Sequence, residues 1–525
     1  MKHLRSRLIT AVCAGFLSVT CFGQSAPSFT TETSASGPAP SHVYAVDVNN
    51  DGLADIIQDT AQPGSTGSYF AVSINTGNGT FLPPVTYKVN ANTWVPLTWG
   101  DFNHDGKVGL AVAVPPSQIA VYLGNGDGTF QSPITTTLNL PNTTWGTFAQ
   151  SSIVAADFNK DGNVDLVAAG YEGSDYFAGP WVIYLLEGDG AGHFTNPVPI
   201  YYPTSGWIVQ TLVAGDFDTD NNADVGLLEY MPCGDGTNEC SANVLTLFGD
   251  GGADFEAVDV TTINGGNTSA GMTLGAADLN NDGTTDLYGI ENVGGKLTLA
   301  VFPGYYGRQF SYWFTPIPSN FPNLGVPRAA ADFNGSGNWA LAALNNSITD
   351  NSSQMVYFLN AGTPNVTIVT GPSPAGGSGW QVGPVVGNFN GDMKPDIAVS
   401  MSPTINSLTS TLAVGVNANT QGFYGRCDSY PKSGEGIRLC SPSASATPGN
   451  VNFAATANSF GQLRKMELWL DGAKIGEEHL VWGQSAFFDL SYPSPSPGTH
   501  SATIFAADID NSLQRYDFTF TTSNP

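Results

Sequence analysis

A nine-residue acidic loop recurs seven times along the chain, at intervals of 54 to 62 residues. The first copy runs from Asp47 to Asp55, with oxygen-bearing side chains at loop positions 1, 3, 5 and 9 and Gly52 at position 6. Later copies begin at Asp101, Asp157, Asp216, Asp278, Asp332 and Asn388. A period of this length is typical of one supersecondary unit per repeat, so we expect an array of similar units.

Short apolar runs flank the loops, as Ile153–Ala156 does before the third copy, and such runs are typical of buried strands bounded by turns. A second submotif, a Gly/Asn/Asp turn that ends in Phe, follows most loops and is clearest at Gly77–Phe81 and Gly126–Phe130. The spacing leaves room for two more strands, and the turn residues suit a tight hairpin. Each repeat is therefore predicted to hold four antiparallel strands, and the array to be an all-β, seven-bladed β-propeller. Six or eight blades remain alternatives because the sixth repeat is degenerate.

The two submotifs, recurring in phase, resemble the FG-GAP/VCBS repeats of the integrin α-subunit propeller, over roughly residues 29 to 423. The resemblance implies that each acidic loop joins the first and second strands of a blade and binds Ca²⁺ on the lower face. Aspartate and asparagine oxygens around a sharp glycine turn are also the ligands that such a hard cation needs. The predicted metal ligands of the four best loops are Asp47, Asn49, Asp51, Asp55, Asp157, Asn159, Asp161, Asp165, Asp216, Asp218, Asp220, Asp224, Asp278, Asn280, Asp282 and Asp286.

Three loops depart from this pattern. The second offers Asp101, Asn103 and Asp105 but has Gly109 at position 9, and the seventh offers Asn390, Asp392 and Asp396 after Asn388 at position 1. The sixth has Ala340 at position 9 and is expected to hold no ion. An EF-hand is excluded because position 12 lies in a strand pattern and is never glutamate. The competing interpretation of all seven loops is a set of Asx-turns without metal.

The two ends of the chain predict further segments. Residues 1–25 combine Lys2, Arg5 and Arg7 with an apolar run, which is typical of a secretory signal peptide. Residues 26–426 are assigned to the propeller, and the segment Ser28–Thr33 is expected to supply the fourth strand of the last blade. Residues 427–525 are predicted to form a small immunoglobulin-like β-sandwich, because short strands and an Asp471-Gly472 hairpin resemble bacterial immunoglobulin-like domains.

The composition restricts the compartment and the partners. A net charge of −27 argues against nucleic acid and anionic membranes as partners, and no transmembrane segment is expected in the mature chain. Two local disulfides, Cys233 with Cys240 and Cys427 with Cys440, are expected in an oxidising compartment. The protein is therefore predicted to be secreted or at the cell surface. Nothing in the sequence fixes its oligomeric state.

No catalytic motif stands out, since the six histidines are scattered and no nucleophile elbow or phosphate loop is present. The predicted function is adhesion or recognition of an extracellular protein or glycan, without enzymatic activity. The alternatives are an extracellular carbohydrate-active enzyme, a glycosidase or polysaccharide lyase with a carboxylate pair on the propeller, and a purely structural envelope module.

Aromatic residues supply the candidate ligand face. Tryptophans recur 7 to 12 residues before a loop, where one blade crosses to the next, at Trp94, Trp145, Trp207 and Trp380. Tyr171, Tyr176, Phe177, Trp181 and Tyr230 are expected in long insertions bordering the same face. Such aromatics stack on sugars or anchor protein partners. The competing interpretation is packing between blades.

Overall fold

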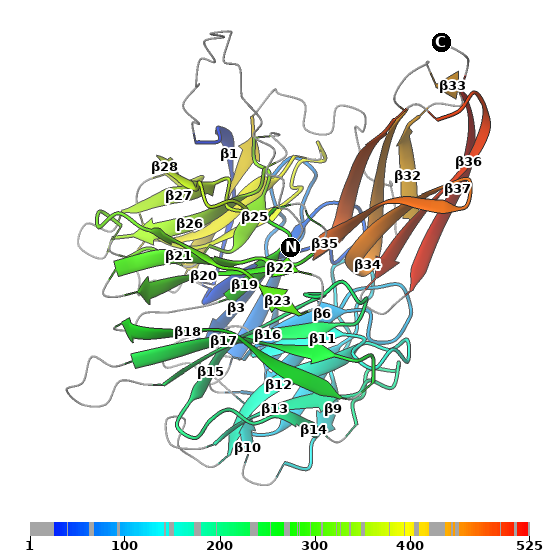
Figure 1. The fold of residues 1–525 in the computed structure, drawn as a ribbon. Coiled ribbons are helices and arrows are strands. Elements are labelled where there is room, and N and C mark those ends of the chain that lie inside the picture. Colours follow the sequence, from blue (N-terminus) through cyan, green and yellow to red (C-terminus); the bar gives the residue numbers. More distant parts are fainter. Residues whose placement is uncertain are drawn as a thin grey trace, which may run out of the picture.

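The computed structural model shows an all-β chain (Figure 1). It describes residues 26–522 except 39, 62–67, 92–94, 141–142, 146–151, 173–179, 196, 232–239, 253, 267–273, 281, 283, 294–295, 306–307, 322, 326, 335–337, 348–351, 377–378, 393, 404–408, 419–435, 443–444, 447–450, 494 and 509–511. The predicted signal peptide lies outside the described residues. None of the described residues forms a helix long and apolar enough to cross a membrane.

Between residues 29 and 417 the strands form antiparallel sheets, and all but the last are built from strands that are close in chain order. The first three sheets are β2 (His42–Val46), β3 (Asp55–Ala61), β4 (Ser68–Ser73) and β5 (Val85–Val89); β6 (Leu97–Gly100), β7 (Gly109–Val114), β8 (Gln118–Tyr122) and β9 (Ile134–Thr137); and β11 (Ile153–Ala156), β12 (Asp165–Glu172), β13 (Trp181–Leu186) and β14 (Val198–Tyr201), to which β10 (Thr143–Trp145) adds.

Four more sheets continue the order. They are β15 (Ile208–Gly215), β16 (Asp224–Met231), β17 (Cys240–Gly249) and β18 (Phe255–Gly266); β19 (Leu274–Ala277), β20 (Asp286–Val293), β21 (Lys296–Phe302) and β24 (Trp313–Pro316); β25 (Ala329–Ala331), β26 (Ala340–Asn346), β27 (Ser353–Leu359) and β28 (Thr367–Gly371); and β29 (Trp380–Gly387), β30 (Asp396–Ser402), β31 (Thr409–Asn417) and β1 (Phe29–Pro38). A short ribbon of β22 (Gly304–Tyr305) and β23 (Gln309–Phe310) follows β21.

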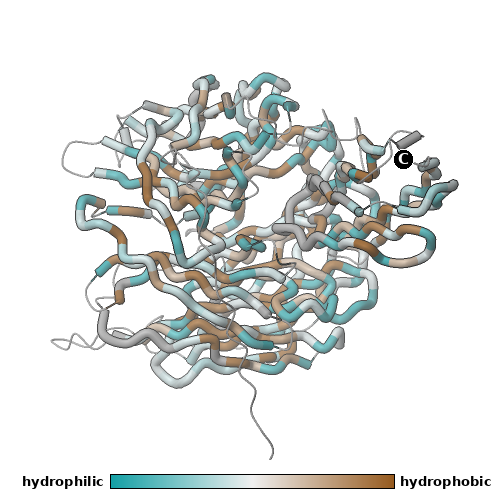
Figure 2. The backbone as a smooth tube through the Cα atoms, turned by 45° about the horizontal axis from the view of Figure 1, so that its top comes forward, coloured by the Kyte–Doolittle hydropathy of each residue, from teal (hydrophilic) through white to brown (hydrophobic). Residues whose placement is uncertain are grey.

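The hydrophobic core lies between consecutive sheets, because most residues of the second and third strands are buried on both faces. One cluster of buried residues joins the sheet of β2 to that of β6, with Phe70 and Leu110 among its members. Equivalent clusters join each later pair of neighbours. A further cluster joins the last sheet back to the first, through Phe389 and Val43. Figure 2 shows the resulting hydrophobic stretches along the strands. The arrangement is β-propeller-like.

First strands of neighbouring sheets lie against each other, as β6 does with β11, β15 with β19, and β29 with β2. These strands therefore surround a common centre. The N-terminal strand β1 pairs antiparallel with β31, in a register that places Phe29 beside Asn417. This confirms that the segment beginning near residue 28 supplies the fourth strand of the last sheet, whose other three strands come from the end of the array.

The C-terminal strands form a separate sheet system. Two long strands, β34 (Val451–Leu470) and β35 (Ala473–Tyr492), pair along their length and turn at Asp471 and Gly472, both with positive φ. The first half of β34 also pairs with β32 (Gly436–Ser441), and its second half with β36 (Gly498–Asp508). β36 pairs with β37 (Leu513–Thr522), and β33 (Ser445–Ala446) joins β37 in parallel.

Two sequence expectations differ from the structure. The separate strands expected near residues 451–457 and 466–470 are parts of one strand, since β34 continues through a register shift after Asn458. Tyr171 and Trp181, expected in an insertion, lie on β12 and β13 and are buried in a core cluster. They lie on strands because the apolar stretches of β12 and β13 continue further than the sequence pattern indicates. Their ring centroids are 5.5 Å apart.

Candidate metal centre

Every acidic loop joins the first strand of a sheet to its second strand. Position 9 is the first residue of the second strand: Asp55 begins β3, Asp165 begins β12, and Asp224 begins β16. Positions 1 and 9 face inward, whereas the position-5 carboxylates of the four best loops are exposed. The turn needs a left-handed backbone, and Gly52 and Gly162 have φ of 87° and 89° at position 6.

The position-9 aspartate connects each loop to the rest of its sheet. In the fourth loop, Asp224 is fully buried and its two carboxylate oxygens accept backbone N–H groups from Phe217 at 2.8 Å and Gly249 at 2.9 Å. The equivalent aspartates Asp55, Asp165, Asp286 and Asp396 accept the same two kinds of hydrogen bond. This structural role was not predicted, although the position-9 recurrence was the signal for it.

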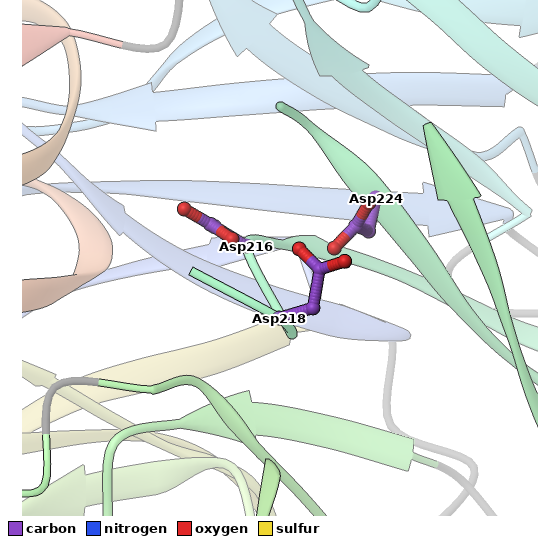
Figure 3. A group of neighbouring side chains, drawn as sticks. All are labelled: Asp216, Asp218 and Asp224. Carbon is purple, nitrogen blue, oxygen red and sulfur yellow. The ribbon is translucent and has the colours of Figure 1, made fainter. Parts of the chain in front are cut away.

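The fourth loop brings its carboxylates closest together. Oxygen atoms of Asp216, Asp218 and Asp224 all lie within 4.8 Å of one another, and the three residues are buried. In Figure 3 the carboxylates of Asp218 and Asp224 point toward each other. Converging, buried carboxylate oxygens are the donor set of a hard divalent cation. The donors thus fit the Ca²⁺ expected from the sequence. The first, third and fifth loops have asparagine at position 3, which contributes an amide oxygen instead.

Burial strongly affects the ionisation of these loops. Desolvation, together with a smaller effect of neighbouring carboxylates, raises the pKa of Asp47 to about 6 and those of Asp165 and Asp396 to about 7. The pKa of Asp224 is raised for the same reasons. A bound cation would favour the charged carboxylates that the protein alone disfavours.

Basic side chains accompany three of the loops. Arg308 lies beside the fourth loop, with Nε 2.9 Å from a carboxylate oxygen of Asp218, and also pairs with Glu256 at 2.5 Å. In the second and seventh loops, Lys107 and Lys394 at position 7 approach the position-5 carboxylates within 3.6 and 3.4 Å. The second loop also lacks an acid at position 9, and the seventh lacks one at position 1.

The two sequence submotifs meet in space. Loop position 2 is often phenylalanine, and its ring packs on the Phe of the glycine-turn submotif in the following sheet. Ring centroids are 6.0 Å apart for Phe102 and Phe194, and 5.9 Å for Phe389 and Phe81 across the junction of last and first sheets. The phenylalanines of both submotifs are buried there. In-phase recurrence of the two submotifs thus reflects a repeated contact between neighbouring sheets.

The tryptophans of the predicted ligand face are only partly described. Trp207 and Trp380 are half-buried. Trp94 and the side chain of Trp145 lie outside the described residues, as do Tyr176 and Phe177. Cys440 is disulfide-bonded, but Cys233 and Cys427 lie outside the described residues. The ligand face and the pairing of the cysteines therefore stay predictions.

Comparisons with known proteins agree with the repeat. The family model described as FG-GAP-like repeat matches residues 105–168 and 157–227, which contain the third and fourth acidic loops. Among solved structures, one titled "Crystal structure of BBS1N in complex with ARL6DN, soaked with lead" has a TM-score of 0.41 and 12% sequence identity, over 75% of this chain and 99% of that chain. No curated protein matches the chain. FG-GAP-like repeats are thus present at two overlapping positions.

Proposed function

We propose that this protein is a Ca²⁺-binding β-propeller of seven blades that recognises an extracellular protein or glycan. The observation that carries the proposal is the fourth loop, where three buried carboxylates converge within 4.8 Å inside an FG-GAP-like repeat. FG-GAP repeats form propeller modules that often serve adhesion or recognition. The same loop recurs at the same place in the first, third and fifth sheets, so four Ca²⁺ ions are proposed.

Three loops are proposed to bind Ca²⁺ weakly or not at all. The sixth lacks a position-9 carboxylate, since Ala340 begins β26 there. The second has Gly109 at position 9, and the seventh has Asn388 at position 1, so each offers one carboxylate fewer. Fewer carboxylates lower the affinity for a divalent ion.

Seven blades and an immunoglobulin-like C-terminal domain belong to the proposal. The blade count is supported by seven core clusters, each bridging two neighbouring sheets, with the last bridging back to the first. The C-terminal assignment is supported by the way β34 pairs with β32 over its first half and with β36 over its second, with Phe453 packed on Phe520 at 5.5 Å. An extracellular location is supported by the basic and apolar N-terminus.

Thermal melting of the mature protein, once with stoichiometric Ca²⁺ and once with excess chelator, tests whether the loops bind the metal. Because an ion bound only by the folded state stabilises it by mass action, chelation should lower the melting temperature, and Ca²⁺ should restore it. Native mass spectrometry should count about four ions, in line with the number of complete loops. A melting curve that chelator leaves unchanged would reject structural Ca²⁺.

The recognition role is tested with arrays of glycans and surface proteins, probed with and without Ca²⁺. Binding without turnover supports a recognition module. Release of reducing sugars from a polysaccharide panel would instead support the alternative, a carbohydrate-active enzyme. Trp207→Ala and Trp380→Ala then locate the face: weaker binding by about 1–3 kcal/mol at an unchanged melting temperature places the ligand on the tryptophans. A loss of about 3–5 kcal/mol of stability would make them packing residues.

A further inference from the structure

A basic side chain reaches the fourth acidic loop from the following repeat. Arg308 lies directly before β23, in the short ribbon that follows β21, and its Nε is 2.9 Å from a carboxylate oxygen of Asp218 at loop position 3. Its Nη2 is 3.8 Å from a carboxylate oxygen of Asp220 at position 5. Only 6% of the Asp218 side chain is exposed, so the acidic partner of this ion pair is shielded from water. The guanidinium group thus pairs with two of the side chains assigned to Ca²⁺.

The fourth loop also differs from the others in sequence at the point of this contact. Loop position 3 is aspartate only at Asp218. The other six loops have asparagine there, namely Asn49, Asn103, Asn159, Asn280, Asn334 and Asn390. The arginine therefore contacts the one carboxylate that distinguishes this loop, and its positive charge offsets the additional negative charge.

The backbone conformation of Arg308 indicates that its side chain has a specific role. Arg308 stands two residues before Phe310, the aromatic residue of its glycine-turn submotif. The corresponding residues in the first three sheets are Gly79, Gly128 and Gly192, with φ of 78°, 83° and 87°. Arg308 adopts the same left-handed conformation with a φ of 63°, which is unfavourable for a residue with a side chain. Such a conformation persists where other contacts enforce it, as the ion pair with the loop does here.

Arg308 has a second set of contacts outside the loop. Its Nη1 is 2.5 Å from a carboxylate oxygen of Glu256 on β18, and its guanidinium carbon lies 5.1 Å from the ring centroid of Phe248 on β17. A cation above an aromatic ring and beside a carboxylate is stabilised by both. Arg308 can therefore leave Asp218 without becoming an unpaired charge, which would be costly.

We propose that Arg308 competes with Ca²⁺ for the fourth loop, so that the loop takes up Ca²⁺ only at a higher concentration than its own carboxylates would require. The competition rests on the proposed binding of Ca²⁺ to these loops. A divalent ion at the three converging carboxylates of Figure 3 would be repelled by the guanidinium group. The ion therefore binds as Arg308 moves from Asp218 toward Glu256 and Phe248. Occupancy of this loop thus responds to the Ca²⁺ concentration.

Calorimetric titration of the metal-free mature chain with Ca²⁺ measures the competition. Arg308→Met removes the charge and should tighten Ca²⁺ binding at one site by about 5- to 20-fold, the range for a partly exposed hydrogen bond between charged groups, and leave the other sites unchanged. Arg515→Met is the matched control, because Arg515 pairs with Asp517 on β37, where both side chains are exposed. It should leave every site as in the wild type.

Two further variants secure the assignment. Arg308→Gly introduces the residue that the first three submotifs have at this position, so it should fold and tighten the same site even if the methionine variant does not fold. Asp218→Asn removes the partner of Arg308. In that background Arg308→Met should change the Ca²⁺ affinity by less than about 3-fold, because the ion pair that opposes Ca²⁺ is already broken. An equal effect in both backgrounds would contradict a competition for Asp218.

The possible results separate this competition from the proposed function. Equal Ca²⁺ affinities in the wild type, Arg308→Met and Arg308→Gly would overturn the competition and leave Ca²⁺ binding by the loops in place. A site that binds Ca²⁺ only in the two arginine variants would support the competition. Absence of Ca²⁺ binding from every chain would overturn both the competition and the proposed function.

Discussion

At the scale of single residues, the acidic loop divides into ligands and a structural anchor. The position-5 carboxylates are exposed, and their hydrogen bonds stay within the loop, as Asp220 shows by accepting the N–H of Asn222 at 2.8 Å. Asp224 at position 9 is instead buried and accepts one backbone N–H group from Phe217 in the same loop and one from Gly249 at the end of β17. The same residue type therefore serves two purposes, which a substitution can separate.

We expect Asp224→Ala to lower the free energy of unfolding by about 2–4 kcal/mol, even when excess chelator has removed all metal. The change leaves two buried backbone N–H groups without an acceptor, and unsatisfied buried groups are costly. Under the same conditions Asp220→Ala should cost less than about 1 kcal/mol, because position 5 is exposed. Urea unfolding measures both. Equal effects in the chelated state would show that position 9 acts only through metal.

A second residue-scale prediction concerns His500 in the C-terminal sheet. Its Nδ1 lies 2.7 Å from Asp471 and its Nε2 2.7 Å from the carbonyl oxygen of Ser496, and the bond to Asp471 raises the pKa of the imidazole. A pKa raised by folding contributes stability below the unfolded value of about 6.5, and this contribution disappears as the pH rises through the folded pKa.

The unfolding free energies of the wild type and His500→Gln should therefore differ most near pH 5.5 and progressively less toward pH 8.5. Urea unfolding of the full chain at intervals between these values measures the difference. A gap that stays constant across this range would mean that protonation of His500 does not contribute to stability. A gap that grows with pH would give the opposite sign and contradict the assignment.

At the scale of elements, the sheets are held together by contacts that repeat from one neighbour to the next. Phe29 of β1 shows how the N-terminus takes part, since its ring stacks on Tyr357 at 6.4 Å and contacts Phe333 at 6.3 Å. These partners belong to the sixth sheet, whereas β1 itself pairs with β31 of the last. A ten-residue N-terminal strand thus both covers a sheet edge and packs on the neighbouring sheet.

Deleting residues 28–36 should lower the stability by at least about 3 kcal/mol, the cost of losing a large buried aromatic ring, with a further loss from the uncovered edge. The control is a chain in which this segment is moved behind residue 418, a short distance because Ala418 N–H donates to Ser28. Thermal melting should show that the moved segment restores the stability. A deletion that melts like the mature chain would mean that β1 is dispensable.

At the scale of the whole molecule, the C-terminal sheet system is connected to the fourth acidic loop. The ammonium group of Lys465 on β34 is buried and donates to the side chain of Asn221, which occupies loop position 6 with a φ of 66°. The N–H of Asn221 in turn donates to Asp216 at 3.0 Å. Glu467 balances the lysine charge at 2.7 Å. A chain of hydrogen bonds thus runs from a proposed metal ligand to the C-terminal strands.

We expect removal of Ca²⁺ from the fourth loop to loosen the C-terminal strands from the propeller-like part. Asp220→Asn should reduce the yield of a cross-link placed between the two parts, whereas the matched Asp51→Asn in the first loop should not. Lys465→Met should have the same effect as loss of the ion, weakening the docking by about 1–3 kcal/mol. Small-angle scattering with and without chelator measures the change. Scattering profiles that change neither with chelator nor with Asp220→Asn would show that the docking is independent of Ca²⁺.

The sequence by itself determined the local structure. Loop chemistry, glycine turns, apolar runs and the Asp471-Gly472 hairpin depend on residues within about ten positions of one another, so their patterns remain legible in the chain. The apolar runs and turns then predicted the all-β class, and the resemblance to FG-GAP/VCBS repeats implied the place of each acidic loop between the first and second strands. The N-terminal strand was also predictable, because its composition matches a fourth strand that no other segment supplies.

Only the tertiary structure decided which of these residues meet. Three contacts join segments that lie 25 to several hundred residues apart: the hydrogen bond from Gly249 to Asp224, the packing of Phe389 on Phe81, and the contact of Lys465 with Asn221. Their geometry depends on how whole sheets pack, and packing is selected by the shapes of many side chains together rather than by any local pattern.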